Sequence, residues 1–240
     1  MISDSTGPEP EQPQNEVRIE AERQLSALVI TIEFTLISVM AGVVLAPLAT
    51  ESTDLLRNLR FEYWPYVLFG LLYVLFVWSG VISHSFTFVG WPFEIGHNLL
   101  YIVWALTLAM QASFLQDPVS WFAMNLIQYL VAGGVGVYDG RILQKCLVGA
   151  SEASRRLFEL ALRRQKRLIW LTPIVMASSG LSLAAIVLYP GLFLDQRLHW
   201  ALGCIQVLIP IGGLVYNIQS LNAWQEPIVR RVMSGLPRGK

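Results

Sequence analysis

The sequence predicts an all-α fold, a polytopic transmembrane helix bundle of about six spans with both termini in the cytoplasm. Composition is the first reason, because 54% of the 240 residues are apolar and only 14% are charged, whereas soluble domains carry about 25% charged residues. The second reason is that the apolar residues gather in six long runs, each close to the ~20 residues that a helix needs to cross a bilayer. The third is the uneven placement of Lys and Arg along the chain.

The six runs are expected to be helices, since a helix satisfies its own backbone hydrogen bonds inside lipid. Transmembrane strands would need shorter segments in which apolar and polar residues alternate, and no such alternation is present. The first run contains a single acid, Glu33, and the second contains no charge. The expected spans are residues 25–49, 64–82, 97–115, 119–138, 168–189 and 200–218.

Two short connections support these boundaries. Asp117 is followed by Pro118 between the third and fourth runs. An aspartate caps a helix N-terminus well, and a proline in the first turn loses no hydrogen bond. Pro190 and Gly191 follow the fifth run, and both residue types end helices.

Three polar segments complete the expected domain organisation. Residues 1–24 form an acidic, Pro- and Gln-rich tail, which we expect to be disordered or charged helix. Residues 25–220 form the six-helix transmembrane domain, and 221–240 form a basic cytoplasmic tail. Within the domain, residues 141–167 predict a basic cytoplasmic helix with one apolar stripe. This helix is expected to extend the fourth span, pack against a neighbour, or lie along anionic headgroups. The stripe consists of Leu143, Cys146, Leu147, Ala150, Leu157, Leu160 and Ala161.

The distribution of basic residues predicts the orientation. Of the 17 Lys and Arg residues, eight lie between the fourth and fifth runs, two in the N-terminal tail and four in the C-terminal tail. Six spans with an inside N-terminus therefore place 14 of the 17 on the inner side. By the positive-inside rule, this favours a multi-pass protein of the plasma (bacterial inner) membrane with both termini cytoplasmic.

One acid at membrane depth suggests a polar cluster. A carboxylate inside the bilayer costs about 3 kcal/mol or more and usually faces the bundle interior with a partner. Glu33 lies at the inner-leaflet level of the first span, where His84 ends the second span and Asn98 opens the third. These three side chains are the hypothesised inner-leaflet cluster. The alternative is that Glu33 snorkels or bonds a nearby hydroxyl such as that of Thr31 or Thr35.

Enzyme, cofactor and metal functions are not favoured. The chain has no Gly-x-Ser-Gly or His-Glu-x-x-His motif, and its two cysteines form no Cys-x-x-Cys pair. His84 and His97 are expected at the opposite membrane edge from His199, which disfavours haem ligation. The amides within the spans are expected to join helices. They are Gln111, Asn125, Gln128, Gln206 and Asn217.

The layout resembles the short, six-helix prokaryotic relatives of the lysosomal potassium channel. The resemblance rests on Trp78, His84 and Phe86 near the end of the second span, on Asn98 and Asn125, and on an Arg-Leu-x-x-Leu-x-Pro segment, residues 167–173, that opens the fifth span. It covers most of residues 20–215. The family's first-helix Phe-Ser-Asp motif is absent, and Glu33 stands in the place of its aspartate.

The resemblance implies an oligomeric, ion-permeable channel for potassium or other monovalent cations. In such a channel the first helix of each copy lines the pore, and an apolar constriction gates it by dewetting. The hypothesised pore-lining residues are Ile37, Met40 and Val44. Two alternatives remain open. One is a small proton-coupled secondary transporter that uses Glu33 as its protonatable site, and the other is a membrane scaffold that recruits partners through its basic cytoplasmic helix. The expected partners are the lipid bilayer, monovalent cations and further copies of the chain, and no nucleic acid.

Overall fold

The computed structural model describes residues 12–87 and 95–235, and within these ranges every regular element is a helix. A short 3-10 turn, η1 (Phe61–Tyr63), precedes α2, and a π-turn, η2 (Gly191–Asp195), precedes α6. The long helices are α1 (Gln12–Arg57), α2 (Trp64–Thr87), α3 (Ile95–Ala112), α4 (Pro118–Val148), α5 (Glu152–Leu188) and α6 (His199–Gly235).

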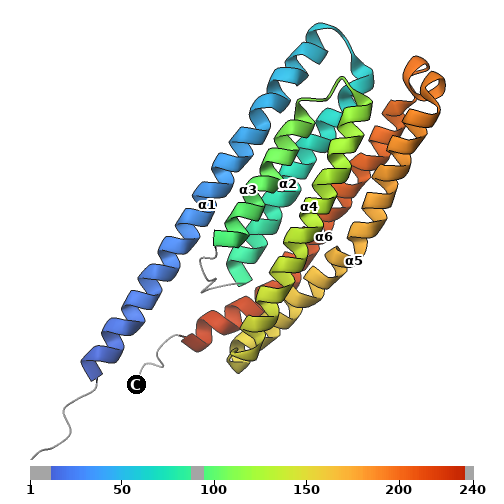
Figure 1. The fold of residues 1–240 in the computed structure, drawn as a ribbon. Helices are drawn as coiled ribbons and strands as arrows, with labels where there is room; N and C mark the ends of the chain where they lie inside the picture. The colour runs from blue at the N-terminus through green and yellow to red at the C-terminus, as the bar shows by residue number, and fades with distance from the viewer. Residues whose placement is uncertain (1–11, 88–94, 236–240) are drawn as a thin grey trace, which may run out of the picture.

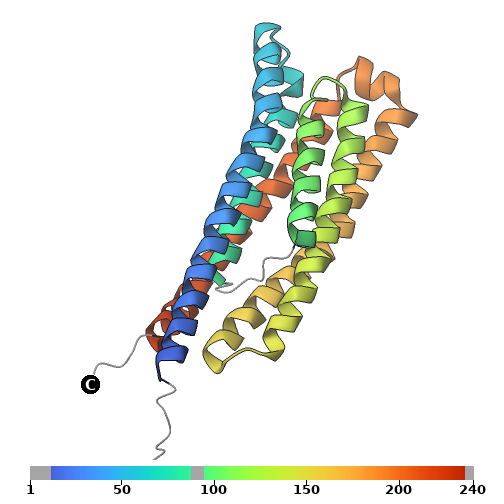
Figure 2. The ribbon, with the colours of Figure 1, turned by 60° about the vertical axis from the view of Figure 1, so that its left-hand side comes forward.

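The six helices run alternately up and down in one bundle (Figure 1). One end holds the α1–α2, α3–α4 and α5–α6 connections, and we call it the far end. The other end holds the beginning of α1, the end of α6 and the α4–α5 turn (Figures 1 and 2), and we call it the terminal end. Among the described residues, the chain thus enters and leaves the bundle at the same end.

Among the described residues, five helices are long and apolar enough to cross a membrane. They also expose large apolar side chains, such as Leu130, Leu181 and Leu208, each more than 60% exposed. Soluble proteins avoid apolar surface on this scale, whereas lipid covers it without cost. The all-helical, membrane-embedded class predicted from the sequence is thus confirmed. The qualifying segments are Phe34–Arg57, Phe61–Ile82, Pro118–Val148, Ser154–Leu188 and His199–Asn222.

The first helix begins earlier than its apolar run. α1 contains 46 residues and is roughly 69 Å long at 1.5 Å per residue. The expected tail, 1–24, is therefore helical from Gln12 onward, because its Glu, Gln and Arg residues are good helix formers. Residues 1–11, the segment 88–94 and residues 236–240 lie outside the described ranges.

The prediction of one basic helix over 141–167 is wrong in its continuity. α4 continues to Val148, the chain turns at residues 149–151, and α5 begins at Glu152. The apolar stripe does exist, but it closes a helical hairpin, in which Ile142 and Leu143 of α4 pack near Phe158 and Ala161 of α5. The basic segment therefore extends both α4 and α5. An extension of the fourth span is one of the three arrangements that the sequence predicts for this segment.

Local signals at α4 act as predicted. The Asp117 carboxylate accepts hydrogen bonds from the backbone N–H groups of Val119 (3.1 Å) and Ser120 (3.3 Å), and Pro118 occupies the first turn. Further along α4, a Cβ on Gly133 would lie 2.9 Å from the Thr172 side chain of α5. Small residues therefore let α4 and α5 approach closely.

Candidate functional site

A cavity of about 480 Å³ lies inside the bundle and is walled by α2, α3, α4, α5 and α6. This size falls within the range of about 300–1,000 Å³ typical of small-molecule sites. Its wall is mainly apolar and aromatic, with a few polar groups toward the terminal end. The aromatic residues of the wall are Tyr73, Phe76, Tyr101, Trp104, Tyr129 and Tyr216.

The first polar group is a buried acid with a histidine partner. Asp139 of α4 lies on the cavity wall, and its Oδ1 is 2.9 Å from Nε2 of His97 on α3. The two side chains are 4% and 10% exposed. Tyr101 packs edge-to-face on the His97 ring at 4.7 Å, and Tyr138 stacks on it at 6.3 Å. The pair is therefore held in one geometry between α3 and α4.

The second polar group is a buried arginine. Arg164 of α5 is 4% exposed, and its Nη2 donates to Oδ1 of Asn217 on α6 at 2.5 Å. The Asn217 amide donates in turn to the Ser79 hydroxyl (2.7 Å) and to the Phe76 carbonyl (3.2 Å), both on α2. Beside Arg164, the Gln165 amide donates to the Gly136 carbonyl of α4 at 2.9 Å. A hydrogen-bond network from α6 and α2 thus holds the guanidinium of α5 at the cavity wall.

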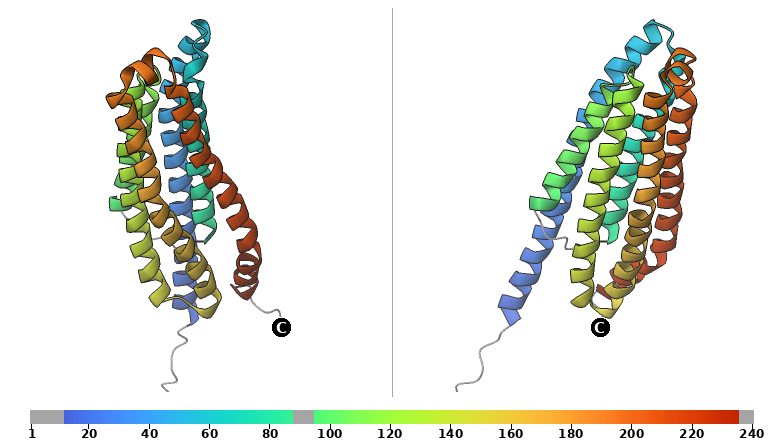
Figure 3. Two further views of the ribbon diagram at one scale, coloured as in Figure 1. Left: turned by 90° about the vertical axis from the view of Figure 1, so that its right-hand side faces the viewer. Right: turned by 45° about the vertical axis from the view of Figure 1, so that its right-hand side comes forward.

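The cavity opens to the side between α5 and α6. Its wall residues on α2 and α4, such as Tyr73 and Val135, are buried, whereas Leu171 of α5 is 52% exposed and Leu208 of α6 is 64% exposed. Gly212 of α6 also lies on the wall, and a Cβ there would meet nothing within 4 Å. Figure 3 (left) shows α6 leaning away from α5 toward the terminal end.

Toward the far end of the bundle, neutral groups join α4, α5 and α6, while Arg197 and Glu62 form an ion pair (3.1 Å) between the α5–α6 connection and η1. Asn125 of α4 donates to the Ser179 hydroxyl of α5 (3.3 Å) and to Oε1 of Gln206 on α6 (3.2 Å). Toward the α5–α6 connection, the Tyr66 hydroxyl lies 2.9 Å from Nδ1 of His199, and the Tyr66 ring packs on Trp121 at 4.5 Å. The expectation that Asn125, Gln206 and Asn217 join helices is confirmed by these contacts.

The hypothesised cluster of Glu33, His84 and Asn98 falls partly outside the described side chains. Glu33 and His84 belong to α1 and α2, but their side chains are not described, and Asn98 is half-buried on α3. The neighbouring His97 pairs with Asp139 instead. The cluster itself stays a prediction.

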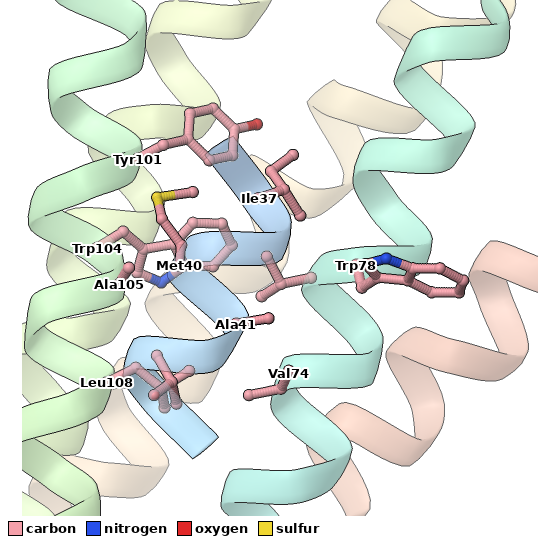
Figure 4. Close-up of a pocket in the computed structure, with 11 residues that line it drawn as sticks. Ile37, Met40, Ala41, Val74, Trp78, Tyr101, Trp104, Ala105 and Leu108 are labelled. Atoms are coloured by element: carbon pink, nitrogen blue, oxygen red, sulfur yellow. The ribbon is translucent and has the colours of Figure 1, made fainter. Parts of the chain in front are cut away.

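The hypothesised pore-lining residues pack inside the chain. Ile37 is 8% and Val44 is 3% exposed, and Met40 is half-buried. All three line a small pocket of about 40 Å³, where they meet Val74 of α2 and Trp104 of α3 (Figure 4). In this arrangement they form an interface between helices of the same chain.

The residues that sequence reasoning missed are Asp139 and Arg164. Asp139 directly follows Tyr138, the expected end of the fourth span. Arg164 is one of the eight basic residues that the sequence places in the connection between the fourth and fifth spans. Helical spacing does carry a signal for Asp139, because Gln128, Val135 and Asp139 recur on one buried face of α4. The apolar stripe carries a signal for Arg164 as well, because Leu157, Ala161 and Arg164 recur on one buried face of α5 at helical spacing.

No group of three or more His, Cys, Asp or Glu residues suited to a metal ion occurs in the part of the chain that was described. Comparison with models of known protein families, with curated protein sequences and with solved structures finds no match. The resemblance to relatives of the lysosomal potassium channel therefore stays a prediction. The described part of the chain is all-helical, with apolar helices long enough to span a membrane and a mainly apolar internal cavity that carries a few polar groups.

Proposed function

We propose that this protein is a small secondary transporter that couples the movement of a solute to the movement of a proton. The supporting observation is the cavity of about 480 Å³, whose wall combines the His97–Asp139 pair with Arg164. The cavity is the proposed solute site, and the pair is the proposed proton site. This assigns to Asp139 the protonatable role that the sequence suggested for Glu33.

The chemistry of the two ends supports a functional role for the charged groups. Ionisable side chains inside a membrane are costly, and they mark proton relays and substrate pathways. Toward the far end, the described contacts between α4, α5 and α6 at Asn125 and Gln206 are made by neutral amides and hydroxyls. Helix packing therefore does not require charge, and the carboxylate and guanidinium at the cavity wall are better explained by binding and proton transfer.

We also propose that α3 crosses the membrane with the other five helices, giving six spans and cytoplasmic termini. α3 packs between α1 and α4, so it shares their environment. The terminal end carries the exposed residues Arg141, Arg155 and Arg167, which the positive-inside rule assigns to the cytoplasm. The cavity's polar groups then lie in its cytoplasmic half.

The ion channel expected from the sequence is the second candidate, and the same assay tests it. A shared pore around α1 needs several copies of the chain, whereas the cavity is built within one copy. The burial of Ile37 and Val44 against α2 and α3 favours the cavity.

The test uses the full-length protein in liposomes with a trapped pH-sensitive dye. Three probes that share one alkyl chain are added outside in turn: octanesulfonate, octyltrimethylammonium and 1-octanol. A proton-coupled carrier changes the lumen pH only when a probe that it accepts is present. Asp139→Asn keeps the shape and a polar contact to His97 but cannot carry the proton, so it should reduce the coupled signal to the level of empty liposomes.

The matched control is Asp195→Asn, because Asp195 is an exposed acid beside the α5–α6 connection. This variant should behave as the wild type does. Potassium efflux without any probe would instead support the channel. The transporter proposal fails if no probe changes the lumen pH, or if Asp139→Asn retains the coupled signal.

A further inference from the structure

We propose that the cavity binds an uncharged, lipophilic molecule of drug size, and that this molecule enters from the hydrocarbon layer through a window between α5 and α6. Binding and entry follow from the geometry of the cavity, whereas the onward transport of the molecule rests on the proposed function. 1-Octanol represents this class, because it has an alkyl chain, dissolves in a bilayer and carries no charge.

Among the described residues, the cavity is open on one side. Its exposed wall residues are Leu171 on α5 and Leu208 and Gly212 on α6. At its two ends the wall is buried, with Tyr129 of α4 toward the far end and Asp139 of α4 toward the terminal end, each 3% exposed. A molecule therefore reaches the cavity between Leu171, Leu208 and Gly212, and we call this opening the window.

Two hydrogen-bonded links between α5 and α6 bound the window along the helices. Toward the far end, Nε2 of Gln206 donates to the Ser178 hydroxyl (3.1 Å), and toward the terminal end Arg164 donates to Asn217. Between these links α5 runs for roughly 21 Å and α6 for roughly 16 Å, at 1.5 Å per residue. Both segments belong to helices that can span a membrane, and both are shorter than the ~30 Å hydrocarbon core. The window therefore opens to hydrocarbon.

The window and the wall behind it present apolar and aromatic surface. Leu171 and Leu208 border the window, and Phe76 of α2 and Tyr216 of α6 line the cavity behind it. Empty space beside such groups leaves part of their surface without van der Waals contacts, which an alkyl or aryl group supplies. The volume of about 480 Å³ suits one drug-sized molecule.

The route and the wall both favour an uncharged molecule. Moving a charge through an apolar window at hydrocarbon depth is costly, because neither water nor a polar group solvates it there. The charged residues of the described wall already bond within the chain, Asp139 to His97 at 2.9 Å and Arg164 to Asn217. The ligand therefore need not supply a charge to either of them.

The first experiment uses 1-octanol that carries a photoreactive diazirine on its chain. The full-length protein in nanodiscs is irradiated with this probe, and mass spectrometry locates the label. We expect label on the wall residues Tyr73 and Tyr129, which are 2% and 3% exposed and therefore out of reach of lipid around the bundle. Excess 1-octanol should remove this label, whereas octanesulfonate and octyltrimethylammonium, at equal amounts in the membrane, should leave it in place.

Two outcomes of this labelling would overturn the inference. One is label confined to lipid-facing residues, because the cavity would then stay empty. The other is removal of the label by a charged probe as effectively as by 1-octanol, because entry would then not depend on passage through hydrocarbon.

A pair of glycine variants tests the route of entry. A Cβ on Gly212 at the window would meet nothing within 4 Å, and the same holds for Gly180 of α5, which lies outside the cavity wall. Gly212→Phe places a ring in the window and should slow the labelling of Tyr129 about tenfold. The rate is measured by freeze-quenching and irradiating samples at set times after mixing. Gly180→Phe adds the same ring elsewhere and should be labelled as fast as the wild type.

Equal labelling rates for Gly212→Phe and Gly180→Phe would overturn entry through the window. Should Gly212→Phe not fold, Gly212→Leu takes its place in the same comparison. The lumen-pH assay separates this inference from the proposed function. Label on the buried wall without any probe-dependent change of lumen pH would support the binding site and overturn the proposed transport. A coupled signal with octanesulfonate and none with 1-octanol would support transport and overturn the uncharged solute.

Discussion

The far end and the terminal end of the bundle hold the same helices together with different chemistry. At the far end, α4, α5 and α6 meet through Asn125, Ser179 and Gln206, and the rings of Tyr66 and Trp121 pack with their centroids 4.5 Å apart. Nearer the terminal end, the same helices surround a cavity and carry a carboxylate and a guanidinium. The far end is therefore closely packed. The region nearer the terminal end contains a cavity and charged groups that helix packing does not require.

The largest expected difference between the two ends comes from replacing one phenylalanine at each of them by alanine. Phe122 is fully buried at the far end, while Phe76 is half-buried and borders the cavity. Phe122→Ala should lower the free energy of unfolding by about 3–5 kcal/mol, because closely packed neighbours cannot fill the gap. Phe76→Ala should cost about half as much, since part of its ring already faces empty space. Thermal unfolding in detergent measures both, and equal costs would remove the distinction between the ends.

A pair of glycines on α6 gives a smaller effect. A Cβ on Gly203 would lie 2.8 Å from Cε1 of Tyr66 and 3.0 Å from Cβ of Pro65, whereas a Cβ on Gly212 would meet nothing within 4 Å. Gly203→Ala should therefore cost about 1–3 kcal/mol through overpacking. Gly212→Ala should be neutral or stabilise by up to about 1 kcal/mol through helix propensity. Circular dichroism melts of the two variants make the comparison, and a destabilised Gly212→Ala would argue against an open gap beside α6.

The smallest effect concerns the neutral contacts of the far end. Asn125→Ala removes bonds to Ser179 and Gln206 and should cost about 1 kcal/mol, as is usual for amides between membrane helices. Ile127→Ala is the control, because Ile127 lies on the same helix and is 45% exposed. The melting temperature should fall only for Asn125→Ala, with little change in the probe-dependent change of lumen pH. A large loss of that signal would mean that both ends belong to one site.

The sequence was sufficient for the fold class and for several local features. Long apolar runs predict helices, and the Asp117 cap and the end of α5 before Pro190 follow from residue types that act within one turn. The polar site was predicted less well, because its partners depend on which helix faces are adjacent. The 20 residues of the expected fourth span end at Tyr138, so Asp139 lies just beyond them. α4 continues for ten residues past that expected end, to Val148. Arg163 and Arg164 are the same residue type, and only their positions around α5 leave Arg163 exposed and Arg164 buried.

The length of the α4–α5 hairpin has a practical consequence. α4 and α5 contain 31 and 37 residues, about 46 and 56 Å at 1.5 Å per residue, which exceeds the ~30 Å thickness of the hydrocarbon core. A compact apolar cluster holds the two helices together up to a three-residue turn. A folded domain inserted at Gly149 would be carried by two rigid helices, and it would give electron microscopy an orientation marker on a protein otherwise too small to align.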